Sequence, residues 1–293
     1  MCGRLQLRGA VVDRLTQRWV VVTGRRVDFT AQHAWLDGPV GSPHGIGDQW
    51  IQQHAARSGA VLVEVADGGL LPDLAALDQP GFRAADLHPA VVDFYERTAA
   101  WELDVWPRWA RWAEPGGRAM NAIFARRLRQ LSLPTDPLDV AYGMHSRIIT
   151  LRTSADDHLG TAWQRTLRAT GSTVFGGFYG IVRLPASAGL SVRVVFPLPN
   201  GSITVFLRPQ VTSRGGLLLT SPRGGFGADG AYLLVRPDGA DRGWARRVGL
   251  PERFHVFVDD RHDLRCDHHL NLGRSEILRL HYRLSRRRAP ATT

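Results

Sequence analysis

Lysine is absent from this sequence: all 37 basic residues are arginines, and with 27 acidic residues the formal net charge is +10. A charge of this size often indicates nucleic acid or an anionic membrane surface as a partner. Here the arginines are spread along the whole chain, and the one dense run is at positions 286 to 288. No RNA-binding or zinc-finger spacing is present. Nucleic acid is therefore not expected as a partner.

Cysteines and long apolar runs are also scarce. The chain has two cysteines, Cys2 and Cys266, and these cannot form a disulfide framework. No stretch approaches the roughly 18 uncharged apolar residues of a membrane-spanning helix. The N-terminus lacks a charged segment followed by an apolar core. Together these absences predict a cytoplasmic location.

The first region, residues 1–85, has a mixed pattern. The runs at 19–29 and 60–69 are typical of short strands, and the run at 46–59 predicts a helix. Asp48 is a plausible N-cap of that helix and Gly59 a C-terminal glycine. No phosphate-binding glycine loop lies between the strands, so a nucleotide-binding fold is not supported.

Residues 86–135 have a helical period and predict an amphipathic helical pair. The first helix begins near Pro89 and carries an apolar stripe that includes Phe94, Trp101 and Val105, and the second helix covers 117–131. Core packing against the sheet is the favoured role of this stripe. Tryptophan beside arginine is also typical of membrane-surface helices, so peripheral membrane contact through residues 101–131 stays open.

Residues 143–285 consist of about ten short alternating strands with turn residues between them, and 286–293 form a polar tail. This spacing predicts an antiparallel β-barrel or sandwich. The fold class expected is thus α+β: a mixed N-terminal segment and two amphipathic helices packed on a curved antiparallel sheet. Asn200 and Gly201 suit a two-residue turn that pairs Leu198 with Ile203. Gly176 and Gly180 inside one strand indicate a bend, and curvature allows such a sheet to enclose a small ligand.

The histidine-rich C-terminal stretch has a register fixed by burial. Pairing Val258 with Leu264, and Leu272 with Glu276, collects the apolar side chains on one face. Only His268 then points inward, between Phe254 and Leu280, where its ring needs a partner in protein, water or ligand. His262 lies in a turn and His269 points outward beside Arg279.

A second set of polar residues forms an outward row across three neighbouring strands: His255, Asp267 and His281. Adjacent Cβ atoms in such a row lie about 5 Å apart, so both imidazoles could bond the carboxylate. The row is a candidate for acid/base chemistry, and its alternative is a hydrogen-bonded surface. A divalent metal is conceivable there, although the outer histidines would start about 10 Å apart and no fourth ligand is visible, so no residue is named as a metal ligand.

Two resemblances accompany these patterns. The strand GTAWQR at 160–165 is similar to the Gly-x-Trp opening of the calycins, with a spacing one residue longer. Segments such as LDVWPRW, FPLPNGS and RFHVFVDD within residues 70–285 resemble an uncharacterised bacterial family of hypothetical proteins. That resemblance implies one fold unit running through both helices and the sheet, and it implies no catalytic residue.

Three functions remain open at this point. The leading one is non-enzymatic binding of a small apolar or lipid-like molecule inside the curved sheet. Its candidate ligand-binding residues are Trp163, Arg165, Phe178, Tyr179, His268 and Tyr282. One alternative is a metal- or His/Asp-dependent enzyme that uses the outward row, or His145 before the first strand of the sheet, as acid/base groups or metal ligands. No nucleophile-elbow, HExxH, paired-cysteine or phosphate-loop motif supports it. The other is a peripheral membrane protein that binds lipid. The sequence predicts neither a cofactor nor an oligomeric state.

Overall fold

The computed structural model describes residues 11–41, 49–110, 144–167, 171, 173–237 and 240–287. Within these ranges it contains three α-helices and four short 3-10 helices. The α-helices are α1 (Val11–Thr23), α2 (Gln49–Ser58) and α3 (Pro89–Glu96). The 3-10 helices cover Ala34–Leu36, Leu74–Leu77, Ala84–Asp86 and Thr98–Ala100.

The described residues also form fourteen strands, all joined in one sheet. They are β1 (Arg25–Asp28), β2 (Val61–Val63), β3 (Trp101–Trp109), β4 (Met144–Arg152), β5 (His158–Leu167), β6 (Thr173–Arg183), β7 (Leu190–Leu198), β8 (Gly201–Val211), β9 (Leu217–Thr220), β10 (Gly230–Val235), β11 (Arg242–Val248), β12 (Glu252–Val258), β13 (Leu264–Leu272) and β14 (Ser275–Arg286). The predicted α+β class with a large antiparallel sheet is therefore confirmed.

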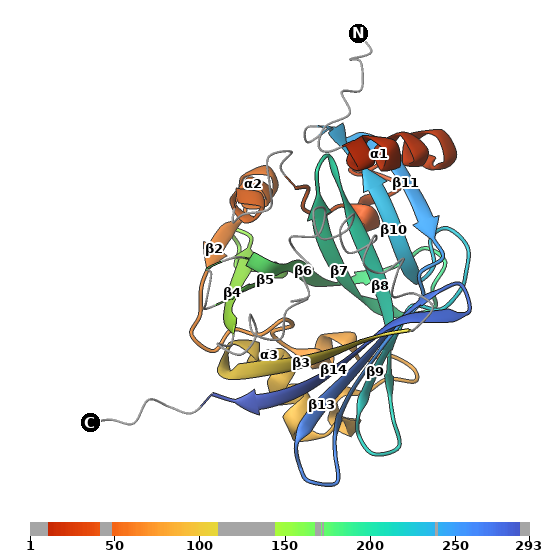
Figure 1. Cartoon of the computed structure of the whole chain (residues 1–293). Coiled ribbons are helices and arrows are strands. Elements are labelled where there is room, and N and C mark those ends of the chain that lie inside the picture. The colour runs from red at the N-terminus through yellow and green to blue at the C-terminus, as the bar shows by residue number, and fades with distance from the viewer. Residues whose placement is uncertain are drawn as a thin grey trace.

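The sheet divides into two arms at β8. The first half of β8 pairs with β7 and β10, and its second half pairs with β9, which leads to β12. One arm consists of β2, β4, β5, β6 and β7, and the other consists of β9, β12, β13, β14 and β3. Figure 1 shows that the strands of the second arm cross below those of the first. The sheet is thus strongly bent but not closed, because its path ends at β2 and β3.

The prediction that Phe94, Trp101 and Val105 share the apolar stripe of one helix is wrong. Helix α3 ends at Glu96, and residues 101–109 form β3, which pairs with the long strand β14. The physical reason is that Trp101 and Val105 lie four positions apart, which suits one face of a helix and equally one face of a strand. Both side chains are buried, whereas Glu102 and Asp104 between them are exposed, as in a half-buried strand. The second predicted helix, at 117–131, lies outside the described residues.

The N-terminal region also departs in part from its prediction. Residues 19–23, expected in a strand because of their valines, belong to α1, and only residues 25–28 form a strand. Gln17 and Val20 are both buried and lie three positions apart, so tertiary packing on β10 and β11 favours the helix over the β propensity of valine. The helix predicted at 46–59 and the strand predicted after it are present as α2 and β2.

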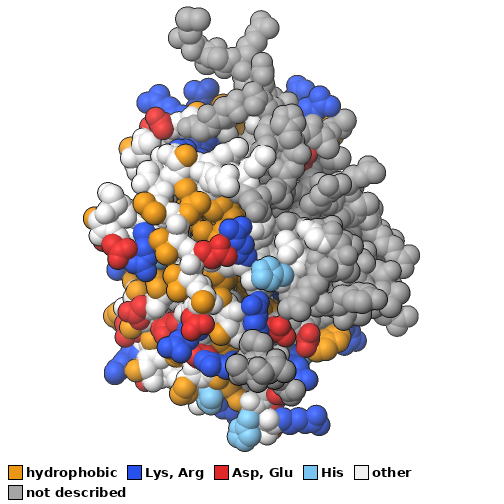
Figure 2. Space-filling view, turned by 90° about the vertical axis from the view of Figure 1, so that its left-hand side faces the viewer, with side chains coloured by type: hydrophobic (Ala, Val, Ile, Leu, Met, Phe, Trp, Pro, Cys, Tyr) orange, Lys and Arg blue, Asp and Glu red, His pale blue; other side chains and the backbone are white. Residues whose placement is uncertain are grey.

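The edge strand β2 leaves apolar side chains in solvent. Val61, Leu62 and Val65 are all exposed. Figure 2 shows this side of the molecule, where hydrophobic side chains are interspersed with charged ones. Glu64 follows β2 directly and forms an ion pair with Arg147 of β4. A short edge strand of this kind, flanked by charges, offers little template for pairing with another sheet.

The β7–β8 hairpin turns at Pro199 and Asn200, with Leu198 opposite Gly201. Asn200 has φ of 57°, as expected for the residue after proline in a tight turn. The pairing differs from the predicted one by two residues, and a shift of two leaves every side chain on its predicted face. Val194 and Val205 therefore still face the same side of the sheet, directly opposite each other.

The C-terminal register is confirmed. Val258 pairs with Leu264, and Leu270 pairs with Leu278, as the burial pattern predicts. A bulge after Leu270 shifts only the last pairs beside the turn, so that Leu272 lies opposite Ser275. The neighbour relations of all the histidines in β12, β13 and β14 follow from this register.

Candidate functional site

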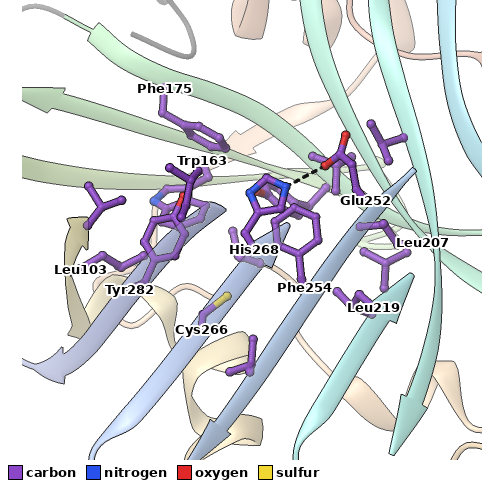
Figure 3. A pocket seen from close by; sticks show the side chains of 18 of the residues that line it. Leu103, Trp163, Phe175, Leu207, Leu219, Glu252, Phe254, Cys266, His268 and Tyr282 are labelled. Carbon is purple, nitrogen blue, oxygen red and sulfur yellow. Dashed lines mark hydrogen bonds and ion pairs between the residues drawn. The ribbon is translucent and has the colours of Figure 1, made fainter. Parts of the chain in front are cut away.

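A cavity of about 200 Å³ lies between the two arms of the sheet. One wall comes from the inward faces of β5, β6, β7 and β8, and the other comes from β3, β9, β12, β13 and β14. Phe94 and Tyr95 of α3 also line it. Most of the lining is aliphatic or aromatic, and Figure 3 shows these side chains converging from both arms. The cavity is somewhat smaller than the roughly 300–1,000 Å³ of ordinary small-molecule sites, which suits a small ligand.

The glycine-rich strand β6 shapes the cavity wall. Gly177 lies opposite Trp163 and between Phe175 and Tyr179 on the same face. A Cβ atom on Gly177 would lie 3.1 Å from the Phe175 ring and 3.2 Å from the Tyr179 ring. The missing side chain therefore gives the three rings room to pack: the Trp163 ring centroid is 5.2 Å from that of Phe175 and 6.0 Å from that of Tyr179.

A hydrogen-bonded pair crosses one part of the cavity. His268 Nε2 lies 3.0 Å from Glu252 Oε2, and both side chains are largely buried. The imidazole also stacks on Phe254, its cross-strand neighbour, with ring centroids 3.7 Å apart. Figure 3 shows the pair and the stack together. Glu252 thus supplies the partner that an inward-facing histidine requires.

A buried arginine lies elsewhere in the cavity wall. Arg165 is 7% exposed, its Nη2 donates to the backbone oxygen of Leu103 at 3.2 Å, and its Nε has no partner. Burial lowers the pKa of this guanidinium, and the neighbouring Tyr282, Tyr179 and Asp104 partly oppose that effect. No carboxylate in the described part of the chain forms an ion pair with Arg165. Its guanidinium group also lies over the Trp163 ring, 5.5 Å from the centroid.

Three further groups near Arg165 carry polar hydrogens. Trp163 Nε1 is buried and has no hydrogen-bond partner. Burial raises the pKa of the Tyr179 and Tyr282 hydroxyls, while the charge of Arg165 acts in the opposite direction. Neither hydroxyl bonds to any residue that the structure describes. Both phenols are therefore neutral at physiological pH and can each donate one hydrogen bond to a ligand.

The structure places five of the six predicted ligand-binding residues in the wall of this cavity: Trp163, Arg165, Tyr179, His268 and Tyr282. Phe178 lies elsewhere. It is fully buried on the opposite face of β6, under α2, with its ring centroid 4.9 Å from that of His54. Alternation along the strand is the reason, because Phe178 and its neighbour Tyr179 must point to opposite faces.

Several lining residues were missed by the sequence analysis, and Glu252 is the most important of them. It lies two positions before Phe254 on β12 and opposite Leu270, so the same register places it on the inward face. The alternation pattern could therefore have identified it. Phe94 and Val105 were expected on an apolar stripe that packs on the sheet, but no local signal predicted that they and Leu103 line the cavity from α3 and β3.

The outward row has the predicted neighbours: His255 pairs with Asp267, and Asp267 pairs with His281. His281 Nδ1 lies 2.5 Å from Asp267 Oδ1. His255 instead stacks on Phe257, with ring centroids 4.6 Å apart, and its buried Nε2 has no partner. Burial, aided by the charge of Arg253, lowers the pKa of His255 against the opposing effect of Asp267.

This outward row does not converge on a common point. Asp267 bonds one of the two histidines, and the row faces away from the cavity. Among the described residues, no group of three or more histidine, cysteine, aspartate or glutamate side chains could hold a metal ion. His281 and Asp267 thus form a hydrogen-bonded pair, and His255 stacks on Phe257 instead of joining it.

One comparison with known proteins found a relative. Over 245 residues, which is 82% of this chain, the sequence is 27% identical to the uncharacterised membrane protein YndJ of Bacillus subtilis strain 168. The chain spans only about 41% of the length of that relative. No protein-family model and no solved structure matches the chain. The resemblance to uncharacterised bacterial proteins is thus confirmed, whereas the calycin resemblance gains no support.

The same comparison corrects the predicted cytoplasmic location. The relative is described as a membrane protein, which contradicts that prediction. In the described part of the chain, no helix combines the length and the apolar composition needed to cross a bilayer.

Proposed function

We propose that this chain binds one small apolar or lipid-like molecule between the two arms of its sheet, without catalysing a reaction. The observation that carries the proposal is the cavity of about 200 Å³ whose walls are mostly apolar. Water in a buried site needs two to four polar partners, and most of this surface offers none. An apolar ligand that buries this surface would stabilise the complex by about 25 cal/mol for each Å² of apolar area removed from water.

The chemistry of the cavity also favours binding over catalysis. Burial raises the pKa of the Cys266 thiol, so the one cysteine in the wall is a poor nucleophile. Glu252 and His268 already bond each other, and the His281–Asp267 pair lies outside the cavity. The walls come from strands that are hydrogen-bonded to their neighbours, so the site is held by rigid elements.

A titration with the neutral fluorescent probe N-phenyl-1-naphthylamine tests this proposal. The purified chain is expected to bind one probe molecule saturably. Val194→Trp fills the cavity from β7 and should weaken probe binding at least about tenfold, whereas Val61→Trp makes the same change on the exposed edge strand and should leave it unchanged. Cys266→Phe is a second, smaller filling variant whose fold can be checked by circular dichroism. Equal probe affinity in both filling variants and in the wild type would overturn the proposal.

A second candidate function adds a membrane surface to the same site. Its support is the description of the relative as a membrane protein and the exposed Trp106 on β3, next to exposed Arg108. Tryptophan and arginine are favoured at the headgroup level of a bilayer. Co-sedimentation with anionic phosphatidylglycerol vesicles tests it: Trp106→Ala should reduce the bound fraction, and Leu272→Ala, at the exposed end of β13, should not. Equal binding of both variants would argue against this candidate.

A further inference from the structure

The donor groups around Arg165 define the chemistry of one end of the cavity. Arg165 is buried, keeps a single hydrogen bond to the Leu103 carbonyl, and has no carboxylate partner among the described residues. Removing an unpaired charge from water is costly, and buried cations in proteins are normally paired. Asp104 interacts with Arg165 electrostatically but is exposed and forms no ion pair with it. Within the described part of the chain, the cation therefore lacks the counter-charge that its burial calls for.

The groups that surround Arg165 are donors as well. Trp163 Nε1 is a donor only and is buried without a partner. Tyr179 and Tyr282 line the same cavity as Arg165. The Tyr179 ring centroid lies 6.0 Å from that of Trp163, the ring over which the guanidinium lies, and Figure 3 shows Tyr282 beside Trp163. Four polar groups that can all donate, one of them positively charged, thus line a cavity whose other polar side chains are Glu252 and His268. An anion with several acceptor lone pairs would satisfy them together.

We propose that the ligand of this cavity is an amphiphile with a single carboxylate, held by Arg165 together with Trp163, Tyr179 and Tyr282, and with its apolar chain between the two arms. This inference rests on the proposed function and specifies its ligand class. One guanidinium balances one negative charge, and a carboxylate matches its planar fork. The Glu252–His268 pair in the same cavity carries its own acidic group and bonds it internally, so the Arg165 end is the anionic subsite. The small volume suits a medium-length chain.

Displacement of N-phenyl-1-naphthylamine by decanoate and by decan-1-ol tests the inference on the wild-type chain. The two compounds share their apolar chain and differ in the charged head. Decanoate should displace the probe at a concentration about ten- to a hundredfold lower than decanol, the difference expected for hydrogen bonds to a buried charge. Equal displacement by both compounds would overturn the anionic subsite and leave the proposed function standing. Absence of probe binding would instead remove the proposed function itself.

Two variants and a control test whether Arg165 and Tyr282 cause the preference for decanoate over decanol. Arg165→Met should abolish the preference for decanoate while decanol still displaces the probe. Arg242→Met removes an exposed arginine of β11 that does not line the cavity, and it should change nothing. Tyr282→Phe removes only a hydroxyl, so this variant should fold even if Arg165→Met does not. It should weaken the binding of decanoate several-fold and change the binding of decanol little. A preference for decanoate that survives in Arg165→Met and in Tyr282→Phe would refute the assignment.

Discussion

His268 and Glu252 bond each other inside the cavity, with His268 Nε2 3.0 Å from Glu252 Oε2 and both side chains shielded from solvent. His268→Leu would leave the Glu252 carboxyl without its partner. We expect a loss of about 1–3 kcal/mol in the free energy of unfolding, because an unsatisfied buried polar group costs that much. Urea denaturation measures it. The double variant His268→Leu/Glu252→Leu should recover part of the loss, and additive losses would contradict a coupled pair.

A substitution at Gly160 should disturb the first arm of the sheet. A Cβ atom there would lie 2.7 Å from the Tyr179 carbonyl oxygen and in still closer contact with the Phe178 ring. Gly160→Ala is therefore expected to lower the free energy of unfolding by about 1–3 kcal/mol, as overpacking does. Gly59→Ala is the matched control, because Gly59 has φ of 64° but open space around it and should cost only about 1 kcal/mol. Equal losses in the two variants would show that the packing at Gly160 is not tight.

The buried histidine of α2, His54, predicts a pH dependence of stability. Burial, followed by the charge of Arg57, lowers the pKa of His54 from 6.5 to about 3. The ring accepts a hydrogen bond at Nδ1 from Arg57 Nη2, 3.0 Å away, and so must stay neutral. Between pH 6.5 and about 3 the unfolded chain binds the extra proton and the folded chain does not, so stability falls as the pH falls through this window.

Urea denaturation at a series of pH values checks this dependence. His54→Asn should flatten the decline by up to about 1.4 kcal/mol per pH unit, which is the contribution of one proton. His262→Asn removes an exposed turn histidine at φ of 63°, a backbone angle that asparagine tolerates, and should leave the decline unchanged. If His54→Asn and the wild type lost stability in parallel, His54 would not be the group that titrates.

The thiol in the cavity wall should be unreactive in the folded chain. Burial raises the pKa of Cys266, which leaves little of the reactive thiolate at neutral pH. In a Cys2→Ser background, labelling by a disulfide reagent should be more than about tenfold slower in native buffer than in urea. The absorbance of the released thiol follows the rate. Rapid stoichiometric labelling of the native chain would show that Cys266 is open to solvent.

The local sequence pattern was sufficient to predict strand pairing wherever one face of a strand is buried and the turn is short. The pairing of β12, β13 and β14 followed from the positions of their leucines and valines, and it placed His268 inward and His281 outward. The same alternation also implies that the side chain of Glu252 points inward. Phe178 and Tyr179 were both expected to bind the ligand, although strand alternation already implies that adjacent residues of a strand cannot face the same cavity.

Other features depend on contacts between distant segments. The apolar pattern of residues 101–109 fits a helix face or a strand face equally well. These residues form a strand because they pair with one edge of β14, a contact with a distant part of the chain. The lack of a counter-charge at Arg165 is a property of the three-dimensional surroundings, since no residue count can show which carboxylates lie near it. Helix α1 likewise forms from a valine-rich segment because its buried face packs on β10 and β11.

A small apolar molecule is expected to occupy the space between Trp163 and His268. A crystal structure grown with bromine-labelled decanol tests it most directly, because the anomalous scattering of bromine locates the ligand. The account predicts one bromine position inside the cavity in the wild-type chain and none in the cavity of Val194→Trp. Bromine found only on the outer surface, or an unoccupied cavity in a crystal saturated with the compound, would contradict it.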